Sequence, residues 1–197
     1  MRTFLLSVTL LITIFCKAQT GNLQIGAVTT LLGDAELGKN EIGAGGELAA
    51  NIAIQKNISV GLGAQLLKFN SEDNLYAPVF ATFKLNLPAK KLVYFLHADA
   101  GYGIHSLKSS LTDTADNGVF KLDFKNTGGL YLATGAGIKL KGKFAPYINV
   151  QYALYGFKFV TKDTDINQSK EYLYSQRNTA KAVTITVGIF LEKRHAK

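Results

Sequence analysis

The sequence predicts an all-β protein: an eight-stranded antiparallel up-and-down transmembrane β-barrel, preceded by a cleaved signal peptide. Three observations favour this class. Eight segments alternate between apolar and polar or small residues with a period of two. Each segment is about 10 to 14 residues long, whereas ordinary strands have about five or six and tilted membrane-spanning strands about nine to eleven. The links between the segments are alternately short and long, as in an up-and-down membrane barrel.

The first residues are typical of a secretory signal. Arg2 precedes an apolar run over residues 4–15, which is too short to cross a bilayer as a helix. We expect cleavage after Ala18, so that residues 1–18 are the signal peptide and 19–197 the barrel domain. An acylated Cys16 is the alternative, but a bulky residue precedes it. Cleavage removes the single cysteine, which leaves no disulfide or thiol chemistry, and lowers the formal charge from +8 to +6 because Arg2 and Lys17 are lost.

The predicted strands follow the alternation in chain order. It is clearest in the last strand, where Val183, Ile185 and Val187 share one face, and in the third, where Ile58 and Val60 do. No later apolar run is long enough for a membrane-spanning helix. The expected strands cover residues 22–32, 42–55, 58–69, 77–87, 92–105, 128–141, 144–157 and 181–192.

The links between these strands differ in length in a regular order. The tight ones are basic, and the longer ones hold nearly all the acidic residues. This pattern predicts that the tight turns lie at the periplasmic rim and the long links outside. Eight strands then place both termini on the periplasmic side. The tight links are 56–57, 88–91 and 142–143, and the long ones are 33–41, 70–76, 106–127 and 158–180.

The two faces of the strands differ in composition. One is uniformly apolar, and the other mixes glycines with polar and charged residues. A soluble barrel would expose the apolar face as a belt well above the few hundred Å² that soluble monomers tolerate. A membrane barrel requires that belt, because it faces lipid. We therefore expect the mixed face inside, and keep a soluble periplasmic barrel as the alternative.

One hairpin resembles a known family. Residues 78–104, PVFATFKLNLPAKKLVYFLHADAGYGI, resemble the central hairpin of small outer-membrane β-barrels of the Bacteroidetes type, which share the architecture of OmpA- and OmpX-like barrels. In that pattern a strand beginning with proline ends in a lysine-rich turn, and the next closes on an Asp-Ala-Gly-Tyr run. The resemblance implies an integral outer-membrane protein. The chain departs from it at its end, because residues 192–197 follow the last aromatic strand.

Inward-facing charges form the candidate site. In a narrow barrel an unpaired ion would cost several kcal/mol, so opposite charges there are expected to pair. We predict a structural ion-pair network that plugs the lumen, which would exclude a general porin. Its members are Glu47, Lys84, Asp99, Lys139 and His97.

We expect no catalytic residue, metal or cofactor. The run HADAGYGIHS at 97–106 contains the residue types of a metal site or of a His–Asp–Ser hydrolase. However, His97 and His105 are about 26 Å apart along one strand. His105 and Ser106 point to opposite faces while the strand lasts. The glycine-rich strings 43–48, 61–66 and 135–142 lack the strand–helix setting of a nucleotide loop. We instead expect a set of strand glycines to face inward beside large rings: Gly43, Gly45, Gly61, Gly63, Gly101, Gly103, Gly135, Gly137 and Gly188. The scattered lysines do not indicate nucleic-acid binding.

The sequence thus predicts an integral outer-membrane barrel with a sealed polar lumen and a structural or surface-interaction role. The long links 106–127 and 158–180 are the expected functional surface, because they carry apolar residues that could contact a partner or extend the hairpins. Expected partners are outer-membrane lipid and lipopolysaccharide, and a surface protein or glycan. We expect a monomer. The alternatives are an envelope lipid-modifying enzyme, similar to a lipid A deacylase and dependent on His105 or a loop residue, and a narrow channel.

Overall fold

The computed structural model describes residues 21–33, 40–70, 75–105, 107–115, 118–126, 128–165 and 170–192. The predicted signal peptide lies outside the described residues. The strands are β1 (Gly21–Gly33), β2 (Asn40–Gln55), β3 (Ile58–Phe69), β4 (Leu75–Pro88), β5 (Leu92–His105), β6 (Leu107–Ala115), β7 (Gly118–Asn126), β8 (Gly129–Leu140), β9 (Phe144–Asp165) and β10 (Lys170–Glu192).

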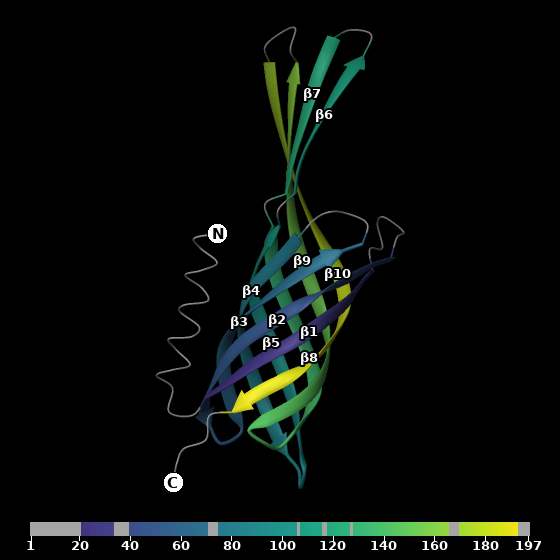
Figure 1. Ribbon diagram of the computed structural model, residues 1–197. Coiled ribbons are helices and arrows are strands. Elements are labelled where there is room, and N and C mark those ends of the chain that lie inside the picture. The colour runs from purple at the N-terminus through teal and green to yellow at the C-terminus, as the bar shows by residue number, and fades with distance from the viewer. Residues whose placement is uncertain are drawn as a thin grey trace.

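Eight of these strands close a ring (Figure 1). Its order is β10-β1-β2-β3-β4-β5-β8-β9, and β9 pairs with β10 to complete it. Every pairing is antiparallel, and β1 meets β10 from Asn22↔Glu192 to Gly33↔Lys181. The predicted eight-stranded up-and-down barrel is therefore confirmed.

Side chains alternate between the inside and the outside of the ring, because successive residues of a strand point to opposite faces. In β5, Phe95 and His97 are buried, whereas Tyr94 and Leu96 are exposed. The exposed face carries large apolar residues on every strand of the ring, so the barrel has an apolar outer band, whereas its core mixes aromatic residues with polar and charged ones. No helix among the described residues is long and apolar enough to cross a membrane.

The tight links form one rim of the barrel, which we call the turn rim. They comprise Lys56-Asn57, residues 89–91 and residues 141–143. Backbone hydrogen bonds join neighbouring turns, with the amide of Lys141 donating to the carbonyl of Lys91 at 3.2 Å. The described ends of the chain lie at the same rim, since Asn22 pairs with Glu192.

The two longest predicted links are strands rather than loops. β6 and β7 form a hairpin inside 106–127, and β9 and β10 run on to Asp165 and Lys170. β7 pairs with the end of β9, so β6, β7 and these strand ends make a four-stranded sheet that stands beyond the barrel (Figure 1). We call it the extension sheet. The prediction that no strand occupies these two links is wrong, and the structure has the hairpin extension that the sequence also allowed.

A glycine marks the joint between barrel and extension sheet. Gly128 precedes β8 with a φ of 80°, a conformation that side chains disfavour. A Cβ at this position would lie 1.8 Å from the carbonyl oxygen of Gly103 on β5. The neighbouring backbones therefore approach closely where β7 gives way to β8, and a larger residue would force them apart.

Inward glycines make room for rings, as predicted. A Cβ on Gly137 would lie 2.3 Å from the ring of Phe95, and one on Gly63 would lie 2.5 Å from the ring of Phe80. The rings occupy the space that the glycines leave, so the lumen is filled by large and small residues in alternation.

Candidate functional site

The centre of the lumen holds a carboxylate and a lysine joined by an amide. Lys84 on β4 donates to the side-chain oxygen of Gln24 on β1, and the Gln24 amide donates to Glu47 on β2. The second oxygen of Glu47 accepts a hydrogen bond from Gln65 at 2.7 Å. Gln24 also contacts the Tyr147 hydroxyl at 2.9 Å. Gln24 therefore relays the interaction between Glu47 and Lys84, both of which are buried.

A second buried chain starts from His97 and Asp99, both on β5. Nδ1 of His97 lies 3.0 Å from a carboxylate oxygen of Asp99, and Nε2 lies 3.1 Å from the side-chain oxygen of Asn149. Asn149 donates to Gln151 at 3.3 Å, and Gln151 donates to the Tyr131 hydroxyl at 3.2 Å. The chain runs from β5 to β9 and β8, so it ties together strands on one side of the barrel.

Lys139 lies apart from these two chains. It forms a 2.6 Å salt bridge with Glu192, the last residue of β10. Its ammonium group also lies 4.6 Å from the centre of the Phe190 ring, and that of Lys84 lies 5.2 Å from the same ring. The described contacts place the five predicted residues in three groups rather than in a single network, because the strand register brings Lys139 to the turn rim.

All five predicted lumen residues are between 5% and 8% exposed, and little space remains among them. A cavity bordered by Gln24, Glu47, Lys84, His97 and Asp99 has a volume of about 10 Å³. That is at the lower limit for holding one water molecule. The described side chains thus fill the middle of the lumen.

Aromatic residues fill the end of the lumen away from the turn rim. The Tyr76 and Tyr155 rings pack edge to face at 5.0 Å, and Phe157 lies 5.5 Å from Tyr76. His105 packs between them, 6.0 Å from Tyr76 and 5.7 Å from Phe157. Ser106 lies outside the described residues. Within the described part of the chain, no three His, Cys, Asp or Glu residues are placed to hold a metal ion.

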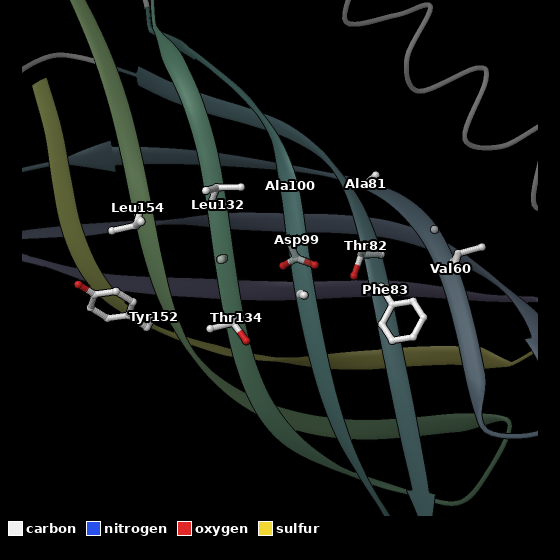
Figure 2. A pocket seen from close by; sticks show the side chains of 13 residues that line it. Val60, Ala81, Thr82, Phe83, Asp99, Ala100, Leu132, Thr134, Tyr152 and Leu154 are labelled. Carbon is white, nitrogen blue, oxygen red and sulfur yellow. The ribbon is translucent and has the colours of Figure 1, made fainter. Parts of the chain in front are cut away.

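Two apolar grooves lie on the outer face. The central groove has a volume of about 590 Å³ and crosses β3, β4, β5, β8 and β9 (Figure 2). Small side chains such as Ala81, Ala98 and Ala100 form it, and Phe83, Leu132 and Tyr152 are among the larger residues that line it. The turn-side groove, of about 480 Å³, is lined by outward residues nearer the turn rim, among them Leu87, Tyr94, Leu96, Ala136, Ile138 and Val150.

The two grooves follow each other along the same strands. On β5 the outward residue Leu96 of the turn-side groove precedes Ala98 of the central groove, and on β9 Val150 precedes Tyr152 in the same way. Outward residues on a strand are two positions apart, about 7 Å. Together the grooves make one apolar track that runs up the barrel wall.

The extension sheet offers free strand edges. Residues 170–180 of β10 pair with β9 on one side, and on the other side no described strand meets them, because the pairing with β1 ends at Lys181. Tyr172, Leu173 and Tyr174 lie on this edge and are strongly exposed, Leu173 at 71%. A strand edge with unpaired backbone groups is a template for another strand.

Comparison with known proteins identifies the fold. No protein-family profile matches the chain, and no curated protein is significantly similar to it. The solved structures that match over most of their length include two with TM-scores above 0.5. Neisserial surface protein A is 12% identical with a TM-score of 0.55, covering 87% of this chain and 96% of its own. Outer membrane protein OprG from Pseudomonas aeruginosa is 10% identical with a TM-score of 0.54, covering 91% and 98%.

The chain has the fold of a small outer-membrane β-barrel. At such low identity the likeness concerns the fold and does not transfer a ligand or an activity. The finer resemblance of residues 78–104 to Bacteroidetes-type barrels stays a prediction.

Gln24 is a lumen residue that the sequence analysis does not name, although the period-two alternation also predicts it to face inward. Gln24 lies on the inward face of β1, and the period of two places it there as surely as it places Glu47 on β2. What the alternation lacks is the height of each residue in the barrel. That height depends on the register between strands, which decides which inward residues meet.

Proposed function

We propose that the chain is an integral outer-membrane protein, a monomeric barrel with a sealed lumen that presents the extension sheet to a partner outside the cell. The turn rim and both described termini face the periplasm in this proposal. Outer-membrane lipid and lipopolysaccharide surround the apolar band, and a surface protein or glycan meets the extension sheet.

The free edge of β10 carries the interaction part of the proposal. Its backbone groups can hydrogen-bond an added strand, while the exposed Tyr172, Leu173 and Tyr174 supply contact area on both faces of the sheet. Aromatic side chains are enriched at protein interfaces for this reason.

Membrane fractionation with gel mobility tests the barrel itself. The protein is expected in the outer-membrane fraction, and its mobility should change on boiling because the folded barrel resists detergent until it is heated. Recovery of the protein in the soluble periplasmic fraction, with no change in mobility, would instead favour the soluble barrel.

Cell binding tests the surface role. Cells that display the chain are compared, on panels of immobilised glycans and extracellular proteins, with cells displaying Leu173→Lys. A lysine on an edge strand disfavours strand addition, so binding should fall while the heat-dependent mobility shift is unchanged. The control is Arg177→Lys, which lies on the same free edge as Leu173, keeps the charge of that position and should bind normally. Val183→Lys would not serve, because Val183 lies on the apolar band of the barrel.

A further inference from the structure

Four lysines gather at one side of the turn rim. Lys90 and Lys91 follow β4, and Lys141 and Lys143 follow β8; all four are exposed. The two turns are neighbours, since the Lys141 amide donates to the Lys91 carbonyl. We call these residues the lysine cluster. The salt bridges of the described residues include none of the four, and Glu192 at the same rim is already engaged by Lys139.

The lysine cluster adjoins the turn-side groove. Leu87, which lines this groove, precedes the turn of Lys90 and Lys91, and Ile138 of the groove lies three residues before Lys141. Exposed Phe144 and Tyr94 flank the same turns, and the Lys143 ammonium lies 5.9 Å from the centre of the Phe144 ring. Aromatic residues beside lysines are typical of the boundary between headgroups and acyl chains.

We propose that the lysine cluster and the apolar track together bind one anionic phospholipid. The lysines hold the phosphate and the negative headgroup, and an acyl chain lies in the turn-side groove and continues into the central groove. This inference rests on the proposed membrane location. It adds a specific lipid site on the leaflet that the turn rim contacts.

The charges favour a lipid over a second copy of the chain. In a symmetric dimer that packs the apolar track of one chain against that of its partner, the two lysine clusters would meet at the same depth, and their like charges would repel. An anionic headgroup has the opposite charge, and basic groups near a membrane surface attract such lipids. A free phosphate ion would leave the adjoining apolar track unused.

Lipid retention tests the site. The chain is folded in phosphocholine micelles, and the mobility shift on boiling verifies the barrel. Phosphatidylglycerol and phosphatidylcholine of equal chain length are then offered together, and the lipid that stays bound is counted by native mass spectrometry. Wild type should retain phosphatidylglycerol preferentially, and Lys91→Gln with Lys141→Gln should lower that preference by about fivefold per lysine. The matched control, Lys68→Gln with Lys181→Gln, removes the same amount of charge at positions away from the lysine cluster. It should keep the preference for phosphatidylglycerol.

A second variant tests the track separately. Ala136→Phe fills the turn-side groove and should reduce retention of both lipids, whereas Ala27→Phe, on the outer face of β1, should not. Equal losses in the two lysine variants, or no effect of Ala136→Phe, would overturn the site. Dimers that persist in excess lipid and are lost in Ala136→Phe would show that a second copy of the chain, and not a lipid, covers the apolar track. Binding of glycerol phosphate equal to that of the lipid would reduce it to a phosphate site. In each case an intact mobility shift leaves the proposed barrel standing, while its absence in wild type contradicts the proposed function itself.

Discussion

In the middle of the lumen Lys84 donates a hydrogen bond to the side-chain oxygen of Gln24, and its ammonium group also lies over the rings of Phe95 and Phe190. Lys84→Met removes this cation and leaves the buried carboxylate of Glu47 without it. Breaking a buried pair from one side costs about 3 to 5 kcal/mol, so the urea midpoint of the mobility shift should fall clearly.

Two further variants separate charge from packing at this position. Lys84→Met with Glu47→Gln removes both charges and should recover part of the stability, because no uncompensated ion remains. Lys181→Met makes the same replacement at an exposed residue and should change little. An unchanged midpoint in Lys84→Met would mean that the lumen charges do not stabilise the barrel.

Gly137 gives a matched test of ring packing. A Cβ there would meet the Phe95 ring at 2.3 Å and the Ile148 carbonyl oxygen at 2.7 Å, so Gly137→Ala should destabilise the barrel by about 1 to 3 kcal/mol. Gly46→Ala, whose nearest contact would be 3.7 Å away, should be close to neutral. Both are measured as the temperature at which the mobility shift is lost. Equal temperatures for the two variants would contradict the account of the inward glycines.

At the residue scale, the sequence predicts the direction of a side chain better than its partner. The period of two places Glu47, Lys84 and Asp99 inside, and the structure has them there. It could not pair Lys139 with Glu192, since the two residues are distant in the chain and meet only through the pairings of β8 with β9 and of β9 with β10. Partners depend on the register of every intervening strand, which alternation leaves open.

At the scale of elements, prediction succeeds where lipid and lumen impose different demands on the two faces. Strand β3 was predicted over its full length, and β5 likewise. The same rule fails for β6 and β7, and for the far halves of β9 and β10. These parts stand beyond the apolar band, where neither face has to be apolar, so their sequence need not alternate.

The β6–β7 hairpin of the extension sheet should be dispensable for folding. Replacing residues 104–128 by a two-residue Asn-Gly turn joins β5 to β8 next to the pair Gly103↔Gly129. The ring closes through pairings that do not involve β6 or β7, so the shortened chain should keep its heat-dependent mobility shift. The same replacement with Gly103→Val, whose side chain would collide with Tyr76, should lose stability and serves as a sensitivity control. Loss of the shift in the parent deletion would show that the barrel needs the β6–β7 hairpin.

At the scale of the whole molecule, the filled lumen predicts an electrically silent barrel. Wild type in a planar bilayer should give no discrete conductance steps, because the cavity among the central side chains, about 10 Å³, is at the lower limit for one water molecule. Replacing Gln24, Glu47 and Lys84 together by alanine removes the middle of the plug and should produce small steps. Steps in wild type at matched protein amounts would favour the narrow channel.

The pairing of β1 with β10 sets a condition on the order of assembly. Position 22 meets position 192, so the seam joins the two ends of the described chain. Until β10 arrives, the backbone N–H and C=O groups on one edge of β1 have no hydrogen-bond partner from β10. Hydrocarbon cannot supply such partners. Contacts this distant in sequence form late and slowly. The barrel therefore completes its assembly after synthesis of β10, and a truncation before residue 181 leaves a chain that cannot close at all.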